Sequence, residues 1–211
     1  MKKTLLGSLI LLAFAGNVQA QPNAETKGTV TFFGKVVENT CKVKTDNRNM
    51  SVVLNDVGKA HLTTKDNTAM PTPFTITLEN CNTTTAAGKP KADKVGVYFY
   101  SWKNADKENS YTLKNIHPND ADKANNVNIQ LMKDNGTDAI AVVGKETEDF
   151  VHKGNADNQT AIARDKNHIS GATELNNQAS IALHYIAQYY ATGTATAGKV
   201  KSSVDFQIAY E

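Results

Sequence analysis

The chain has 211 residues and a formal net charge of +2, and 40% of its residues are hydrophobic. This length suits one domain with a sizeable core. A nearly neutral chain without a run of Lys or Arg lacks the electrostatic footprint of a nucleic-acid-binding protein, so we expect no nucleic-acid partner.

The first twenty residues are typical of a secretory signal peptide. Lys2 and Lys3 form a positive start, an apolar stretch covers residues 5–15, and the small residues of Val18-Gln19-Ala20 suit a signal peptidase. The apolar stretch is shorter than the roughly 20 residues of a membrane-spanning helix. We therefore expect export and removal of residues 1–20. Losing two of the 23 Lys and Arg residues leaves as many basic as acidic residues, and this neutrality permits self-association.

Two cysteines, Cys41 and Cys81, both lie in the part expected to be exported. In an oxidising compartment such a pair predicts one disulfide. It would close a loop of about 40 residues, worth roughly 4 kcal/mol on the chain-entropy model. The alternatives are two free buried thiols or half of a metal site. Zinc sites use close pairs of ligands, and neither cysteine has a Cys or His neighbour at that spacing.

Apolar and polar residues alternate with a period of two in much of the chain, which predicts β-strands. Asp134-Asn135-Gly136 is a hairpin signal between two of them. The long polar segments 83–94, 103–126 and 146–178 are expected to be surface loops that cannot support a second core. Repeated short strands of this kind predict an all-β sandwich. In chain order, the apolar stretches lie at Val30–Phe32, Val36–Val37, Val52–Leu54, Phe74–Leu78, Val95–Phe99, Val127–Leu131, Ala139–Val143, Ile181–Tyr189 and Val200–Tyr210.

The C-terminal segment alternates up to the end of the sequence. Its polar face consists of odd-numbered residues, and no further element follows to protect its edge. We expect a strand with one buried face, either an ordinary terminal strand of a closed sandwich or an exposed edge. The other face carries Val200, Ser202, Val204, Phe206, Ile208 and Tyr210.

The segment of residues 21–33 begins with a polar, Pro-containing stretch and then alternates as well. Thr26, Gly28, Val30 and Phe32 share a face, and only a single glycine separates the segment from the next apolar stretch. Because no tight turn pairs this strand locally, it is free to pair with the exposed edge of another molecule. Gly28 either marks a close backbone approach or serves as a flexible spacer.

Three motifs in this order resemble the chaperone–usher (type 1-like) pilins. Gly28-Thr-Val-Thr-Phe-Phe-Gly-Lys-Val-Val-Glu-Asn-Thr-Cys41 is similar to the N-terminal signature of that family. Pro73-Phe-Thr-Ile-Thr-Leu-Glu-Asn-Cys81 is similar to its strand with the second cysteine. The penultimate Tyr210, with Gly198 as the fourteenth residue from the end, resembles its chaperone-recognition motif.

The resemblance implies an immunoglobulin-like β-sandwich that is incomplete because it lacks its last strand. The pilin domain would cover residues 34–211, preceded by an N-terminal donor-strand extension at residues 21–33. Thr26, Gly28, Val30 and Phe32 would form the donor strand. The strand that flanks the open groove and meets the chaperone would carry Gly198, Val204, Phe206, Ile208 and Tyr210.

The same resemblance implies a structural major subunit of an adhesive fimbria at the cell surface. Its partners would be neighbouring pilin subunits in a homopolymer, a periplasmic chaperone, an outer-membrane usher and a tip adhesin. Each donated strand would replace the chaperone strand, and head-to-tail repetition would give a fibre.

Motifs for catalysis, cofactors or metals are absent from the sequence. Five histidines are scattered, and no H-x-H, H-E-x-x-H, G-x-S-x-G or P-loop pattern occurs. We therefore expect neither an enzyme nor a cofactor or metal site. The main alternative is a self-contained secreted carbohydrate-binding adhesin domain. Tyr98, Tyr100 and Trp102 could line a sugar site in it, although a core or sheet-surface role is favoured for these rings.

Overall fold

The computed structural model describes residues 36–38, 40–82, 87–89, 91–147 and 170–211. The chain divides into residues 1–33 and residues 34–211, and all the described residues belong to the second part. The expected signal peptide and the predicted donor strand with Thr26, Gly28, Val30 and Phe32 lie outside the described residues.

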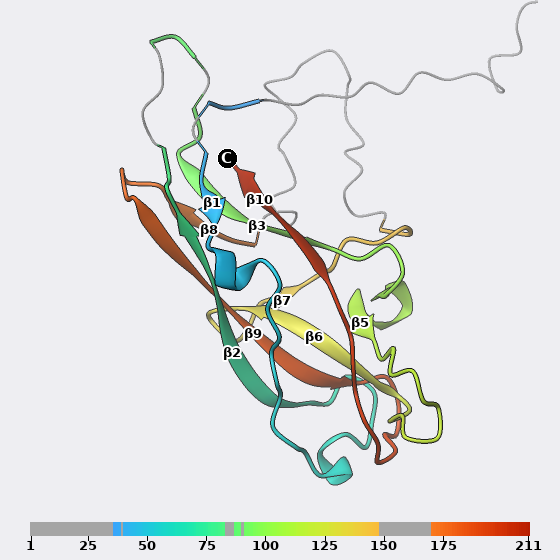
Figure 1. Cartoon of the computed structure of the whole chain (residues 1–211). Coiled ribbons are helices and arrows are strands. Elements are labelled where there is room, and N and C mark those ends of the chain that lie inside the picture. The colour runs from blue at the N-terminus through green and yellow to red at the C-terminus, as the bar shows by residue number, and fades with distance from the viewer. Residues whose placement is uncertain (1–35, 39, 83–86, 90, 148–169) are drawn as a thin grey trace, which may run out of the picture. The chain divides into compact units, whose positions relative to one another are not determined.

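Seven of the strands in the described part form one antiparallel sheet, which we call the large sheet. Its order is β1-β2-β9-β6-β5-β4, and β7 pairs with β6. Figure 1 shows the long strands β2 and β9 side by side, with β6 next to β9. The bounds are β1 (Lys42–Val43), β2 (Thr68–Glu79), β4 (Ala105–Asp106), β5 (Thr112–Lys114), β6 (Val127–Lys133), β7 (Ala139–Ile140) and β9 (Ser180–Ala191).

The second sheet, the small sheet, has the order β10-β3-β8 and is also antiparallel. Its strands are β3 (Lys94–Tyr100), β8 (Ser170–Glu174) and β10 (Asp205–Tyr210). The C-terminal strand β10 is therefore an edge strand of this sheet.

Helical structure is limited in the described part to the short 3₁₀ turns η2 (Thr45–Asn47), η3 (Lys59–His61) and η4 (Lys107–Asn109). None of these turns has the length or the apolar character needed to cross a membrane.

The core lies between the two sheets because both contribute one apolar face to it. In β9, Leu183 and Tyr185 are buried, whereas Ala182 and His184, which alternate with them, are exposed. In β3, Val97 meets them from the other sheet in the same core cluster. Successive side chains of a strand point to opposite faces, so period-two alternation buries one face and exposes the other.

The strands with the clearest alternation are confirmed: β2, β3, β6, β9 and β10, together with the predicted turn between β6 and β7. The prediction that residues 103–126 and 146–178 are only surface loops is wrong, because β4, β5 and β8 lie in them. These strands are too short to show a period, and their buried residues include polar ones. Asp106 of β4 accepts hydrogen bonds from Asn109 and Asn128 at 2.8 and 2.9 Å.

The predicted disulfide is confirmed: Cys41 and Cys81 are joined. The bridge connects the residue just before β1 to the chain just after β2, the two strands that pair at the edge of the large sheet. It thus closes the loop that contains residues 42–80, in which β1 and β2 are both formed.

Tyr185 connects the two sheets and predicts how stability depends on alkaline pH. Its side chain is 1% exposed, its ring contacts those of Phe74 and Phe99, and its hydroxyl donates to the carbonyl of Ser170 at 2.8 Å. Burial, followed by the charge of Asp134, raises the pKa of Tyr185 far above its usual value. The folded state disfavours the phenolate of Tyr185. The stability that the buried, neutral Tyr185 contributes is therefore complete below about pH 10 and is lost as the pH rises further.

We expect the free energy of unfolding of the processed chain to fall between pH 10 and 12, by up to about 1.4 kcal/mol per pH unit from this residue. Tyr185→Phe should be about 1 kcal/mol less stable at pH 8 through loss of the hydrogen bond, yet decline less steeply above pH 10. Urea unfolding followed by circular dichroism at pH 8, 10 and 11.5 measures both. Equal alkaline slopes in the two proteins would contradict the assignment.

Candidate functional site

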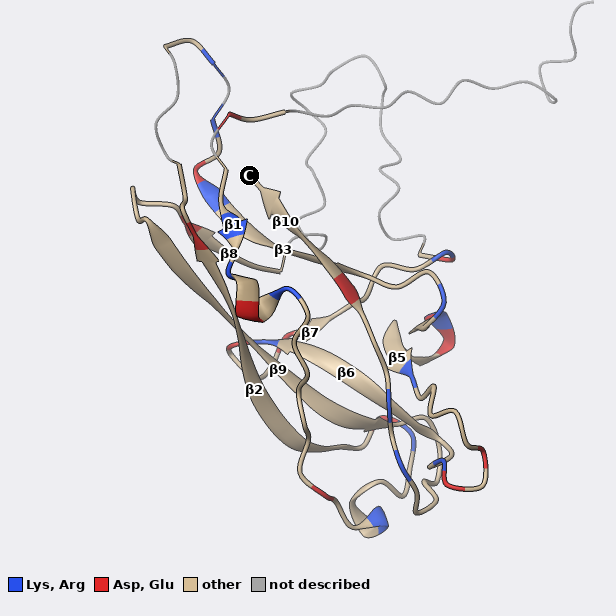
Figure 2. Ribbon diagram, viewed as in Figure 1, with Lys and Arg blue, Asp and Glu red and all other residues tan. Residues whose placement is uncertain are grey.

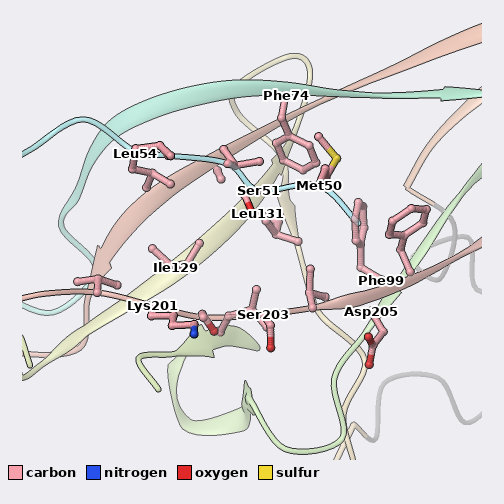
Figure 3. A pocket seen from close by; sticks show the side chains of 18 of the residues that line it. Met50, Ser51, Leu54, Phe74, Phe99, Ile129, Leu131, Lys201, Ser203 and Asp205 are labelled. Atoms are coloured by element: carbon pink, nitrogen blue, oxygen red, sulfur yellow. The ribbon is translucent and has the colours of Figure 1, made fainter. Parts of the chain in front are cut away.

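A groove with a volume of about 1040 Å³ opens between two chain segments above the inner face of the large sheet. We call residues 49–56 the N-terminal rim and residues 198–206 the C-terminal rim. Figure 3 shows the first, with Met50, Ser51 and Leu54, across from the second, with Lys201, Ser203 and Asp205. The apolar floor between the rims consists of Phe74, Ile76, Leu113, Ile129, Leu131 and Ala187.

The floor of the groove carries no charge. The strands of the large sheet beneath it have almost no ionised side chains, and Lys, Arg, Asp and Glu are dispersed over loops and strand ends (Figure 2). Phe74 and Ile129 remain only half-buried, although both pack against the core cluster. Apolar surface of this kind gains free energy when a further apolar side chain covers it.

The N-terminal rim forms no strand, but its side chains alternate. Val52 and Leu54 are half-buried and line the groove, whereas Ser51 and Val53 are exposed, Val53 by 85%. Within the described residues, the backbone N–H and C=O groups of this rim have no hydrogen-bond partner.

The C-terminal rim is bonded along only one of its edges. The odd-numbered residues Lys199 and Lys201 exchange backbone hydrogen bonds with the loop of residues 115–124, such as Lys199 N–H to the carbonyl of Asp122 at 2.6 Å. The backbone groups of the even-numbered Val200, Ser202 and Val204 have no partner in the described part of the chain. Because successive backbone groups of an extended chain point to alternate edges, the free groups lie on the opposite edge, toward the groove.

An apolar floor between two rims with free backbone groups suits one kind of ligand. An extended peptide can exchange main-chain hydrogen bonds with the rims and place every second side chain on the floor. The strand β10, at the edge of the small sheet, continues the C-terminal rim. A peptide in the groove would therefore extend the small sheet by one strand.

The structure brings most of the predicted C-terminal site residues to this groove. Gly198, Val204 and Phe206 line it. Ile208 and Tyr210 lie further along the same half-buried face and pack against the core. The predicted alternation of the segment is confirmed, and the role of these residues in chaperone binding stays a prediction.

Tyr210 lies beyond the groove, at the C-terminal end of β10. Its hydroxyl oxygen accepts a hydrogen bond from the backbone N–H of Cys41 at 2.6 Å, beside the disulfide. Burial raises the pKa of Tyr210, which keeps the phenol neutral. The last residue is bonded as well, because the carbonyl of Glu211 accepts from the N–H of Asp93 at 2.7 Å. The C-terminal strand is thus bonded to β3 on one side and to the start of β1 at its tip.

Gly198, at the other end, is required by a close backbone approach. A Cβ atom at this position would lie 2.6 Å from the carbonyl carbon of Lys123 and 2.8 Å from the carbonyl oxygen of Asp122. Both are backbone atoms and cannot move aside as a flexible side chain would. The glycine therefore lets the rim lie directly against residues 122–124.

Sequence reasoning missed the N-terminal rim and the asparagines beside the C-terminal rim. The run Val52-Val53-Leu54 gave a signal for a strand but none for its lack of a partner. Asn115, which is buried and bonded to Lys199 and Lys201 of the rim, gave no signal because it stands in a polar segment rich in asparagine.

The aromatic residues considered for a sugar site lie on the surface of the small sheet, on the side of β3 away from the core. The ring centroids of Tyr98 and Tyr100 are 5.6 Å apart, those of Tyr100 and Trp102 are 6.0 Å apart, and Trp102 is 60% exposed. Their sheet-surface role is confirmed. His184 is also exposed and lies 3.0 Å from the hydroxyl of Thr75. In the described ranges, no three His, Cys, Asp or Glu side chains come together as a metal site would require.

These features define an all-β sandwich with an open edge groove, and comparison with known proteins places it in a family. The family model described as fimbrial protein matches residues 25–211, so the chain belongs to the fimbrial protein family. It is 71% identical to a major fimbrial subunit of Haemophilus influenzae over 213 residues, which covers 100% of both chains. It is 39% identical to the F17 fimbrial protein of Escherichia coli, over 87% of each chain.

Among solved structures, the fold is similar to that of a chaperone–usher pilus subunit from a study of rod uncoiling. The TM-score is 0.53 at 18% sequence identity, over 89% of this chain and 97% of that chain. The family is structural rather than enzymatic, so the chain is a structural subunit of a surface fimbria.

Gly198→Ala tests the close approach of the C-terminal rim. The added methyl group should push the rim away from residues 122–124, break the bonds of Lys199 and lower stability by about 1–3 kcal/mol. Gly58→Ala is the matched control, because its Cβ would meet only one side-chain atom, at 3.9 Å. Thermal unfolding and backbone hydrogen exchange of residues 122–124 measure the effect. A variant as stable and as well protected as the control would show that the glycine is not required.

Proposed function

We propose that this subunit polymerises by strand donation, with residues 21–33 of one copy occupying the groove of the next. The observation that supports this proposal is the pair of rims with free backbone groups on either side of an apolar floor. In these terms the domain, residues 34–211, is an immunoglobulin-like sandwich whose last strand comes from a neighbour. Each copy carries one donor and one acceptor at different places, a head-to-tail arrangement that does not close and so produces a fibre.

The donor has the side chains that the groove needs. Thr26, Gly28, Val30 and Phe32 share a face, and burying Val30 and Phe32 against the floor contributes on the order of 1.5–3 kcal/mol each. Main-chain hydrogen bonds to both rims satisfy groups that would otherwise need water or another chain.

The donor strand extends beyond residue 33 in our proposal. Val36 falls on the same face as Val30 and Phe32, and its side chain is 91% exposed in its own subunit. Residues 28–36 are as many as residues 198–206 of the C-terminal rim, so a strand of that length, about 30 Å, spans the rim from end to end. A large apolar side chain left uncovered beside the donor segment is explained if a neighbour covers it.

The exposed edge of the sheet is the reason that the subunit would need partners during assembly. An unpaired strand edge above an apolar floor pairs readily with any other chain and leads to aggregation. After export directed by residues 1–20, a periplasmic chaperone would cover the face with Val204, Phe206, Ile208 and Tyr210, beginning at Gly198. An outer-membrane usher would then exchange the chaperone strand for a donor strand, and an adhesin would occupy the fibre tip. The full-length similarity to major fimbrial subunits favours this function over that of a self-contained carbohydrate-binding domain.

Phe32→Asp should abolish fibres, because it places a carboxylate on the apolar floor at a cost of several kcal/mol. Thr31→Asp is the matched control: it introduces the same charge one residue away, on the opposite face of the donor. Fimbriae are counted by electron microscopy, and subunit export is measured by immunoblot of the periplasm. Normal fibres from Phe32→Asp, or equal loss in both variants, would show that the donor face is wrongly assigned.

Two deletions separate chaperone capture from polymerisation. Deleting residues 21–33, with the signal peptide kept, should leave a chaperone-bound subunit that forms no fibre. Deleting residues 206–211 should remove the groove edge, so that the subunit no longer co-purifies with the periplasmic chaperone of its fimbrial system and is degraded. Affinity purification from periplasm measures both. Chaperone binding by the C-terminal deletion at the intact level would refute the assigned edge.

A further inference from the structure

The C-terminal rim is held by side chains in addition to its few backbone hydrogen bonds with residues 116–124. Within residues 198–203 the chain belongs to no strand, although β10 starts two residues later and pairs with β3. The role inferred for these side chains rests on the proposed function, since it concerns how the groove presents its free edge to a donor.

Asn115 makes the most complete contact with the rim. Its amide nitrogen donates to the carbonyls of Lys199 and Ala124, both at 2.9 Å. Its amide oxygen accepts from the N–H groups of Lys201 and His117, both at 3.0 Å. The residue is 8% exposed. The side chain thus donates both of its hydrogens and accepts twice, which is the full capacity of an amide.

Asn104 repeats this pattern two residues further along the rim. Its amide nitrogen donates to the carbonyl of Ser203 at 3.0 Å, and the residue is buried. The hydroxyl of Ser202 adds a bond to the carbonyl of Lys114 at 2.8 Å. Two asparagines therefore bind the backbone of residues 199, 201 and 203, all odd-numbered.

We propose that Asn115, assisted by Asn104, is a positioning residue that fixes the register of the acceptor edge. By holding the odd-numbered backbone groups, it turns those of Val200, Ser202 and Val204 toward the donor. A rim that slipped by one residue would turn Lys201 and Ser203 onto the apolar floor, because a shift of one residue exchanges the two faces of a strand.

An amide is the side chain that this position requires. Asp lacks the two donors and would set a negative charge against two carbonyl oxygens, and Leu has the shape of Asn without any polar group. A buried carbonyl that loses its donor keeps its desolvation cost. When residue 115 is Asp or Leu, the C-terminal rim should move away from it and let water in. The backbone groups of the rim should then face the donor in more than one register.

The test uses the full processed chain and a synthetic peptide of residues 21–38 as the donor probe. Asn115→Asp should bind the peptide at least about tenfold more weakly than the wild type, because it loses the hydrogen bonds donated to Lys199 of the rim and to Ala124 beside it and sets a negative charge against both carbonyls. Asn128→Asp is the matched control. It changes another buried asparagine, which donates to Asp106 and Thr112. It should lower the melting temperature at least as much, because it places a carboxylate beside Asp106, and yet leave peptide affinity within about twofold.

The register in which the donor peptide binds distinguishes a positioning role from a loss of stability, because a general loss of stability would not change it. A peptide with a photoreactive benzophenone at position 32 should cross-link to one short stretch of the wild-type groove and to several stretches in Asn115→Asp. If that variant does not fold, Asn104→Ser, which removes the bonds to the carbonyl and the hydroxyl of Ser203 but none of those made by Asn115, should still broaden the cross-links. Equal affinity and unchanged cross-links in the Asn115 or Asn104 variants overturn the inference. Absence of peptide binding by the wild type overturns the proposed function instead.

Discussion

The rest of this structure depends on backbone hydrogen bonds that the described part of the chain does not make for itself. Along both rims of the groove, N–H and C=O groups stand free beside an apolar floor. Water satisfies these groups but leaves Phe74 and Ile129 half-exposed, and covering those side chains without a strand would leave the backbone groups buried and unpaired. Only an added strand meets both demands together, which is why an incomplete sheet edge can act as a specific binding site.

The C-terminal edge, from Gly198 to Tyr210, is held at both of its ends within the subunit itself. At one end Tyr210 bonds to the backbone of Cys41, whose disulfide connects the strands beside it. At the other end Gly198 lets the rim lie against residues 122–124, and Asn115 bonds to the residues that come next in the rim. A preorganised edge lowers the entropy that a donor must lose with its acceptor.

The sequence predicts the fold where alternation is long, and it predicts only half of the groove. Residues 181–189 alternate over nine positions, so β9 could be placed from the pattern alone. Strands β4, β5 and β8 could not, because their two to five residues include buried polar groups such as Asp106 that resemble a loop. In the groove, the C-terminal rim follows from its alternation, but the N-terminal rim is defined by a missing partner. A local pattern shows which residues favour a strand and does not show which strands lack neighbours.

The short connection between the proposed donor strand and Cys41 explains why a strand from a neighbour would suit the groove better than the chain's own. Only residues 37–40 separate Val36 from Cys41, whose backbone N–H donates to Tyr210 at the C-terminal end of β10. The C-terminal end of a self-inserted donor would therefore have to lie near Tyr210. Such a strand would run parallel to β10, whereas every pair in the small sheet is antiparallel. A strand from another copy has no such tether and can pair antiparallel, the arrangement with the straighter and slightly stronger hydrogen bonds. In the proposed assembly, the short connection thus favours exchange between copies over closure within one, and such exchange would produce a fibre.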